Sequence, residues 1–192
     1  MQPSLSFEID SAAESRLLEI ARESIEAGAA AERAPRIDVD GCAGLLQPAA
    51  VFTTLTRDGA LRGCVGSLQA QRPLAQAVAD SAFNAAFHDR RFKPLDVGEF
   101  GLVRIEISVL SAMQPIDAPT RQALLEQLQP GIDGLLVEDR GCRATFLPKV
   151  WENLAAPGAF VDQLLVKAGL GAGYWSQTLS LYRYHTHSFG EK

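Results

Sequence analysis

The sequence predicts an α+β fold in which a mixed, largely antiparallel sheet is flanked by helices. Two β-rich hairpins, with turns at Arg57-Asp58-Gly59 and Asp139-Arg140-Gly141, exclude a purely parallel doubly wound sheet. Helical apolar periods precede, separate and follow these hairpins. A hairpin followed by a helix occurs around residues 51–88 and again around 135–168, which makes an internal structural duplication possible.

The first half of the chain begins with a helix and continues into the first hairpin. Ser11 and Glu14 have capping-box spacing, and apolar residues at helical intervals predict a helix that ends at Gly28. Residues 29–47 lack a period and predict a long loop. The later elements of this half are strands at 51–56 and 61–68 and a helix at 73–88, whose alanine-rich face predicts close packing on a sheet.

The second half predicts shorter elements in a similar order. Alternation of apolar and polar residues indicates a half-buried strand over 103–109. The expected elements that follow are a helix at 120–129, hairpin strands at 135–138 and 142–147, a helical turn at 148–154, a helix at 159–168 stopped by Gly169, and one closing strand at 178–189.

Composition bounds the class of protein. With 192 residues, 47% hydrophobic and 21% charged, the chain predicts one compact domain over residues 1–192, or two sub-domains that share one core. No apolar stretch is long enough to span a membrane, and the N-terminus lacks a signal-peptide pattern. Three cysteines without a CxxC pair indicate reduced thiols, so we expect a cytoplasmic protein. The net charge of −5 argues against binding of duplex DNA.

The segment Leu61-Arg-Gly-Cys-Val-Gly66 is the most informative one for chemistry. Glycines inside a strand indicate a bulge, or a place where another backbone or a ligand comes close. Arg62 and Cys64 fall on the same face of the predicted strand, and a cation beside a thiol favours a nucleophile or a thiolate ligand. The alternative is a buried structural cysteine beside Gly63 and Gly66, with the glycines needed for a tight crossing.

A second segment, Phe87–Pro94, carries several charges at the end of the predicted helix. Residues 57–93 hold six basic and three acidic side chains, a local positive island and a candidate anion subsite on an acidic protein. The cations equally complement the helix dipole, and Asp89 could simply pair with a neighbouring arginine at the surface. Glu106 and Ser108 lie on the polar face of their strand, where Glu106 is either a general base or part of a solvated face.

Other residue patterns point to no metal or nucleotide site. His185 and His187 fall on one face of the closing strand, but no partner residues have metal-ligand spacing around them. His88 lies elsewhere. Trp151, Tyr174 and Trp175 flank turns and are expected to anchor the C-terminal half. No phosphate-binding glycine loop, zinc-protease motif or nucleophile elbow occurs. We therefore expect no metal and leave the cofactor unassigned.

Several motifs in order resemble the AMMECR domain family. The hexapeptide Leu61–Gly66 is similar to the family hallmark LRGCIG, with Val65 in place of Ile. The resemblance covers residues 10–189 approximately. The further matching segments are Pro73-Leu-Ala-Gln-Ala-Val78, Ala85-Ala-Phe-His-Asp-Arg-Arg-Phe-Lys-Pro-Leu95, Ile105-Glu-Ile-Ser-Val-Leu110, Asp133-Gly-Leu-Leu-Val-Glu138 and Leu147-Pro-Lys-Val150. Arg90 departs from the usual Pro, and Lys149 from the usual Gln.

The resemblance implies two unequal sub-domains with a cleft lined by the hallmark strand. It implies no established reaction. Bacterial and archaeal members are often encoded with a Memo-like protein and a radical-SAM enzyme and are then called AmmeMemoRadiSam system protein A, so these two proteins are the implied partners. Carried over residue by residue, the family motifs fall on positions that include Gly63, Gly66, Asp89, Phe92 and Ser108.

Two classes of function remain open, with nucleic-acid binding less favoured than either. In the first, an enzyme binds a small anionic ligand through Arg62 and Arg91, with Cys64 as the nucleophile or thiolate ligand and Glu106 or Asp89 as the proton-transfer group. In the second, the hallmark strand is a non-catalytic docking surface for a protein partner, and Cys64 is a core residue.

Overall fold

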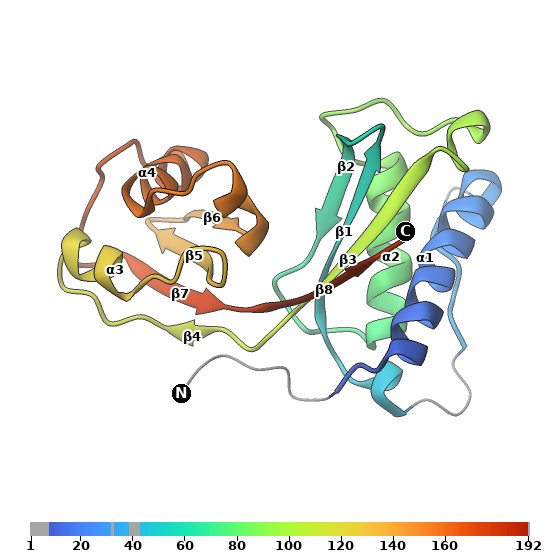
Figure 1. The fold of residues 1–192 in the computed structure, drawn as a ribbon, viewed down its shortest axis with the longest axis horizontal. Coiled ribbons are helices and arrows are strands. Elements are labelled where there is room, and N and C mark those ends of the chain that lie inside the picture. Colours follow the sequence, from blue (N-terminus) through green and yellow to red (C-terminus); the bar gives the residue numbers. More distant parts are fainter. Residues whose placement is uncertain (1–7, 32, 39–42, 192) are drawn as a thin grey trace. The chain divides into compact units, whose positions relative to one another are not determined.

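The computed structural model describes residues 8–31, 33–38 and 43–191, which form two compact units (Figure 1). The larger unit contains residues 8–110 and 187–191, and the smaller unit contains Ser111–Thr186. Each unit has its own four-stranded sheet, and the pairs β1–β2, β1–β3, β4–β7, β5–β6 and β5–β7 are antiparallel. The α+β class is therefore confirmed, while the single sheet is corrected to two. The cleft and the internal duplication stay predictions.

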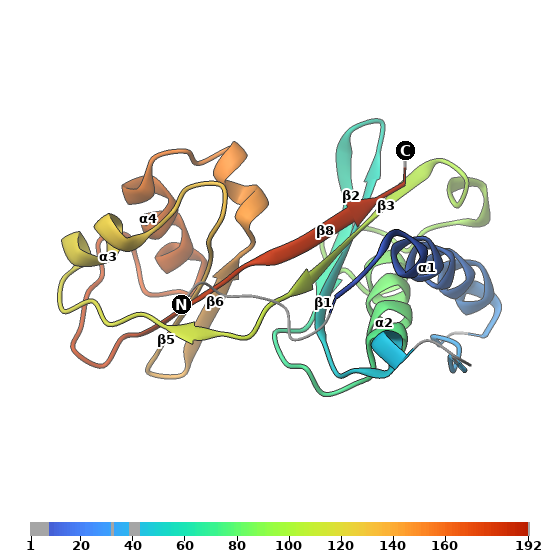
Figure 2. The same ribbon diagram turned by 60° about the horizontal axis from the view of Figure 1, so that its bottom comes forward.

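The larger unit is a sheet with two helices on one face (Figures 1 and 2). Its strand order is β2-β1-β3-β8, so the hallmark strand β2 is an edge strand. Helix α2 packs on the sheet and α1 packs on α2. The element bounds are α1 Ser11–Ala31, a 3₁₀ turn η1 Ala43–Leu46, β1 Ala50–Arg57, β2 Ala60–Gly66, α2 Leu74–Phe87, a 3₁₀ turn η2 Val97–Glu99, β3 Val103–Leu110 and β8 Thr186–Gly190.

Small residues let these layers approach one another closely. The Ser24 hydroxyl donates to the Ala79 carbonyl across α1 and α2 at 2.7 Å, and Gly28 lies against the ring of Phe83. The alanine face of α2 is buried, as its composition predicts. Between β1 and β2, Asp58 and Gly59 have φ of 51° and 79°, the paired positive values of a type I′ hairpin turn.

The start of α1 differs from the prediction by one residue. Asp10, not Ser11, caps the helix, because its Oδ1 accepts the backbone N–H of Ala13 at 2.8 Å. The helix also continues past Gly28 to Ala31, since Gly28 supplies close contact with Phe83 and does not act as a stop.

This capping residue can be tested by two alanine substitutions. Asp10→Ala removes the acceptor for an N-terminal N–H group and the charge that complements the helix dipole, so we expect about 1 kcal/mol lower stability. Ser11→Ala is the matched control and leaves the cap in place. Urea unfolding of both variants measures the difference, and equal losses would contradict Asp10 as the cap.

The smaller unit is a second antiparallel sheet with helices packed on it (Figure 1). Its strand order is β4-β7-β5-β6. Trp151 stacks on Phe160 with ring centroids 3.7 Å apart, and its Nε1 donates to the Asp133 carbonyl. The bounds are β4 Gln114–Pro115, α3 Arg121–Gln127, β5 Gly134–Asp139, β6 Cys142–Phe146, a 3₁₀ turn η3 Pro148–Glu152, α4 Pro157–Lys167 and β7 Ser180–Tyr184.

The expected closing strand is two strands in two different sheets. β7 pairs with β5 in the smaller unit, whereas β8 belongs to the sheet of the larger unit. His185 separates them: its backbone N–H donates to the Ser111 hydroxyl, and its carbonyl accepts from the Ser111 N–H. A continuous apolar and polar alternation cannot show that the strand changes sheets. Among the described residues, no helix is long and apolar enough to cross a membrane.

Candidate functional site

The hallmark strand β2 contains a bulge. Leu55 pairs with Gly63, but the next residue of β1, Thr56, pairs with Leu61. Arg62 is therefore the extra residue, and its side chain leaves the alternation expected of a regular strand. The structure thus bears out the bulge that glycines in this strand predict.

The two glycines of the hallmark are places of close backbone approach. A Cβ on Gly63 would lie 2.2 Å from the Ala85 carbonyl oxygen in α2, and a Cβ on Gly66 would lie 2.2 Å from the Val51 carbonyl oxygen in β1. Neither glycine needs an unusual φ, so the constraint is space. These positions hold the helix and the neighbouring strand tightly against β2. Any ligand role for them stays a prediction.

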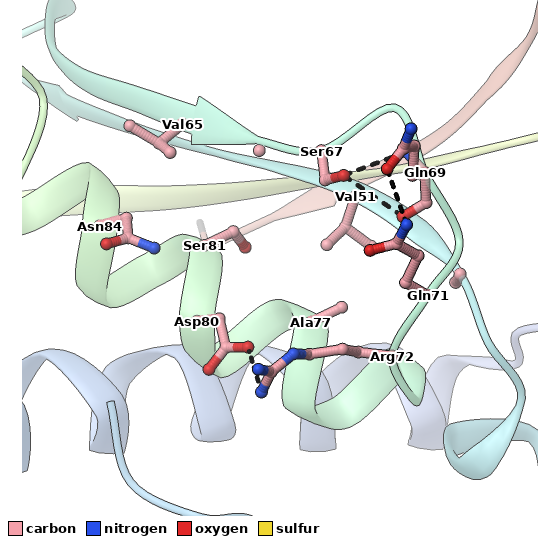
Figure 3. Close-up of a pocket in the computed structure, with 12 residues that line it drawn as sticks. Val51, Val65, Ser67, Gln69, Gln71, Arg72, Ala77, Asp80, Ser81 and Asn84 are labelled. Carbon is pink, nitrogen blue, oxygen red and sulfur yellow. Dashed lines mark hydrogen bonds and ion pairs between the residues drawn. The ribbon is translucent and has the colours of Figure 1, made fainter. Parts of the chain in front are cut away.

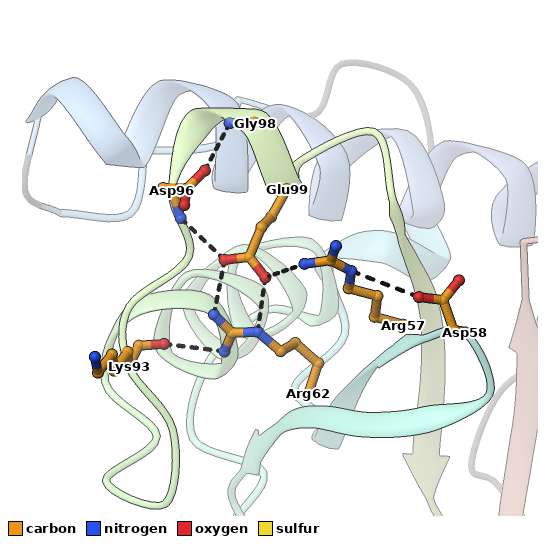
Figure 4. A network of polar contacts seen from close by, with 7 residues as sticks. All are labelled: Arg57, Asp58, Arg62, Lys93, Asp96, Gly98 and Glu99. Atoms are coloured by element: carbon orange, nitrogen blue, oxygen red, sulfur yellow. Dashed lines mark hydrogen bonds and ion pairs between the residues drawn. The ribbon is translucent and has the colours of Figure 1, made fainter.

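Arg62 is bound to a carboxylate of its own chain (Figure 4). Its Nε and Nη2 donate to the two carboxylate oxygens of Glu99 at 3.0 and 2.9 Å, and its Nη1 donates to the Lys93 carbonyl. Arg57 donates to the same carboxylate at 3.0 Å. These arginines, Arg62 above all, lower the pKa of Glu99 to about 2. The edge of the Arg62 guanidinium that would clamp an anion is therefore occupied.

Asp89 and Arg91 cover the free edge of β2 at Cys64. The Asp89 carboxylate accepts the Cys64 backbone N–H at 2.8 Å, and Arg91 Nη2 donates to the Cys64 carbonyl at 3.2 Å. The two side chains make the hydrogen bonds that a neighbouring strand would otherwise make with the Cys64 peptide groups. The edge of β2 is therefore not free to pair with another strand at this residue. Asp89 also accepts Nε and Nη2 of Arg91, which lowers its pKa to about 2. At neutral pH this carboxylate is a charged anchor.

The Cys64 thiol lies on the face of the sheet opposite the helices. The Thr54 hydroxyl, directly across on β1, donates to its sulfur at 3.4 Å. Glu106 is opposite Thr54 on β3, so the three side chains form one row. Neighbours in such a row have Cβ atoms about 5 Å apart, so the Cβ of Glu106 is about 10 Å from the Cβ of Cys64. That separation is too long for direct proton transfer between the two side chains.

The remaining predicted ligand residues are held by their neighbours. Ser108 is buried and shares a hydrogen bond of 2.9 Å with Ser188. The guanidinium groups of Arg62 and Arg91 both lie near the Phe92 ring, with their central carbons 6.0 and 5.5 Å from its centroid. Phe92 thus packs against both arginines.

Most of the positive island is neutralised by ion pairs. Arg72 pairs with Asp80 and Arg91 pairs with Asp89, while Arg57 and Arg62 share Glu99. The Asp89–Arg91 pair is the one foreseen as an alternative, but the Asp89 side chain is buried at 6% exposure instead of lying on the surface. Arg91 itself stays 55% exposed. It therefore combines solvent exposure with a direct hydrogen bond to Cys64.

In the described part of the chain, the hydrogen bonds of the three histidine rings go to Asn84, Asp133 and Glu14. His185 Nε2 lies 3.1 Å from an Asp133 oxygen in the smaller unit, and His187 Nε2 lies 2.7 Å from Glu14 in the larger unit. The expectation that they share one strand face is therefore wrong, because the chain changes sheets between them. In the part of the chain that the structure describes, no three His, Cys, Asp or Glu side chains are grouped to hold a metal ion.

Sequence reasoning missed Thr54 and Glu99. Asp96 and Glu99 form a capping box on η2, and the Asp-x-x-Glu spacing is a signal by which Glu99 could have been found. Thr54 carries no such signal, since only the register of β1 with β2 places it opposite Cys64. Cys42 lies outside the described residues, and Cys142 is a free thiol in the smaller unit.

The family model of AMMECR1 matches residues 18–189, a span that contains the hallmark strand and both sheets. The chain belongs to the AMMECR1 family. Curated archaeal relatives agree: a protein of Aeropyrum pernix is 36% identical over 92% of this chain and 78% of its own length. A protein of Methanosarcina mazei is 32% identical over 91% of this chain and 89% of its own length.

A solved structure agrees with the architecture of this chain. The crystal structure of an uncharacterised protein from Pyrococcus horikoshii superposes with a TM-score of 0.91 at 28% sequence identity. The match covers 97% of this chain and 95% of that chain. The names of these relatives assign no activity to them.

Proposed function

We propose that the edge of β2 at Cys64 binds a small anionic molecule and that the Cys64 thiol reacts with it. The observation that carries the proposal is the double role of Asp89. Its carboxylate holds the Cys64 backbone and the Arg91 guanidinium together, so that a cation is fixed beside Cys64, where it donates to the Cys64 carbonyl. A fixed cation beside a cysteine is the arrangement that favours attack by sulfur on a substrate.

Each group at this edge has a separate task. Arg91 supplies the positive charge, and its pKa is raised above the ordinary value, first by Asp89 and to a smaller extent by the Cys64 side chain beside it. Thr54 donates a hydrogen bond to the sulfur and so orients it. Arg62 and Glu99 hold the loop after α2 in place. Asp89 is a positioning residue in this proposal, because its carboxylate faces backbone and guanidinium groups.

The test compares a neutral and an anionic alkylating reagent of the same shape. Iodoacetamide and iodoacetate are reacted with the native protein, and each cysteine peptide is quantified by mass spectrometry. We expect iodoacetate to be favoured at Cys64 relative to Cys142, which is the internal reference thiol in the smaller unit. In Arg91→Gln the iodoacetate preference at Cys64 falls about threefold to tenfold, because one nearby charge is lost.

Arg90→Gln is the matched control, since Arg90 is the adjacent arginine, is exposed and leaves Asp89 untouched. Its expected preference equals that of the wild type, and Arg91→Lys keeps most of it. An equal preference for iodoacetate over iodoacetamide at Cys64 and Cys142 would contradict the proposal. A Cys64 thiol that reacts only after unfolding would also contradict it.

A docking role for the hallmark strand is the alternative that such a failure would favour. The implied partners, a Memo-like protein and a radical-SAM enzyme, come to this chain from the family resemblance alone. Strand addition at Cys64 is disfavoured, because Asp89 and Arg91 already occupy the backbone groups that a partner strand would use. A docking partner would therefore contact side chains such as the exposed Leu61.

A further inference from the structure

A hollow lies on the face of β2 opposite the Cys64 thiol, between the strands and α2 (Figure 3). Its volume is about 190 Å³. Val51 and Val65 form the wall on the sheet and Ala77 forms part of the wall on α2, while exposed residues of the loop from Ser67 to Arg72 border one end. Cys64 does not line it, since successive residues of a strand point to opposite faces.

Two carboxamides present one hydrogen-bonding atom each to this cavity. Asn84 Oδ1 is engaged with His88 Nδ1 at 3.0 Å, and its Nδ2 points into the hollow (Figure 3). Gln71 donates through Nε2 to Gln69 at 2.8 Å, and its Oε1 points into the hollow from the bordering loop (Figure 3). Among the described residues, neither inward atom has a hydrogen-bond partner. One end of the cavity thus donates and the other accepts.

The charged groups at the rim compensate each other. Arg72 pairs with Asp80 at 3.2 Å, and Gln76 donates to the second oxygen of that carboxylate. Ser81 is also satisfied, by Thr53 and by the Val78 carbonyl. An ionised ligand would lose water without gaining an unpaired opposite charge, which is costly. A neutral ligand has no such cost.

The two amide groups lie apart along the helix. Ala77 and Asn84, which both line the cavity from α2, are seven residues apart along the helix, about 10 Å at the helical rise. A single carboxamide group is too short to meet both ends. A flat ring that carries a hydrogen-bond acceptor on one side and a donor on the other would reach both amides, while its faces lie against the valine and alanine walls.

We propose that this cavity binds a small, neutral, planar heterocyclic amide, of the chemical kind of a nucleobase or a nicotinamide ring. Asn84 donates to the acceptor of the ring and Gln71 accepts from its donor. The site is independent of the Cys64 chemistry, because it uses the opposite face of the strand and other side chains.

The experiment titrates the full chain with two matched pairs of probes. Nicotinamide and uracil are neutral, whereas nicotinate and orotate have the same rings with a carboxylate. Binding is followed by the ¹H–¹⁵N signals of the side-chain amides of Asn84 and Gln71. We expect saturable shifts with the neutral probes at dissociation constants of about 1 mM, the range of ligands of this size, and at least about tenfold weaker binding of the anions.

Three variants and one control locate the site. Ala77→Leu fills the cavity from a half-exposed helix position and should abolish the shifts. Asn84→Leu keeps the size of the side chain but removes the donor, which should weaken binding about threefold to tenfold. Ala60→Leu makes the same change as Ala77→Leu at an exposed position outside the cavity and should change nothing, as should Cys64→Ala.

The unfolding midpoint of each variant is measured beside the titration, so that a loss of binding is not mistaken for a loss of fold. Equal affinity for nicotinamide and nicotinate, unchanged binding in a folded Ala77→Leu, or no saturable shift with either neutral probe would overturn the proposal. Loss of probe binding in Cys64→Ala would also overturn it, because it would place the probe on the other face.

Discussion

Replacement of Gly63 by alanine should destabilise this protein strongly. The new Cβ would lie 2.2 Å from the Ala85 carbonyl oxygen and 3.1 Å from its carbonyl carbon. Both contacts are with the backbone of a helix that is packed on the sheet, so no side chain can rotate away. We expect a loss of about 3 kcal/mol, at the upper end for overpacked positions.

Gly101→Ala is the matched control. Gly101 has no heavy atom within 4 Å of an added Cβ, and no positive φ. Its expected change in the free energy of unfolding is smaller than about 1 kcal/mol in either direction. Urea unfolding of the two variants compares them directly. A Gly63→Ala variant as stable as Gly101→Ala would show that α2 and β2 can separate without cost, against the close packing described above.

Loss of the Glu99 carboxylate should have the second largest effect. Glu99→Gln keeps the shape but leaves Arg57 and Arg62 without the charge that they share, and the Arg62 side chain is only 16% exposed. We expect about 2 kcal/mol lower stability at pH 7, because a charge is left without its partner in a half-buried place. Glu152→Gln is the control, since Glu152 is exposed at the end of η3.

The pH dependence of stability gives an independent reading of the same carboxylate. Its pKa is lowered from 4.5 to about 2 in the folded protein, so the stabilisation is complete above about pH 4.5 and is lost as the pH falls toward 2. Asp89, lowered from 3.8 to about 2, adds a loss in the same direction. The wild type should therefore lose stability steeply between pH 4.5 and 2.

The total loss of stability between pH 4.5 and 2 should be smaller in Glu99→Gln than in the wild type, by at most about 3 kcal/mol. This is the free energy that corresponds to the lowered pKa of Glu99. Thermal unfolding at a series of pH values, at constant ionic strength, measures the slope for the variant, the wild type and Glu152→Gln. An acid limb in Glu99→Gln as steep as that of the wild type would mean that Glu99 is not held as a carboxylate between the two arginines.

Local structure followed from local sequence. The turn at Asp58-Gly59 was readable because Asp and Gly tolerate the positive φ that a two-residue hairpin requires. The strand β3 could be predicted from the sequence because one of its faces is buried and the other is polar. Helix α2 was readable from its apolar period and the proline that precedes it. The glycines of β2 likewise indicated a bulge and a close approach.

Contacts between distant segments were decided by the tertiary structure. The residues on either side of His185 belong to different sheets, a change that an unbroken alternation does not reveal. Arg62 is a residue type that often binds anions. In the folded chain, however, its guanidinium donates to the carboxylate of Glu99, 37 residues further along the sequence. Asp89 resembles a general base in the sequence, yet the Cys64 backbone and Arg91 use its oxygens.

The sequence by itself determined the family, the class of fold and the strand on which the thiol lies, because those depend on motifs and periods of neighbouring residues. Which charges remain available to a ligand was decided only by the tertiary structure. A charged side chain in a folded chain takes the best partner within reach, and that partner is set by how remote elements pack. Of the arginines at this edge, Arg91 is the one left 55% exposed beside Cys64.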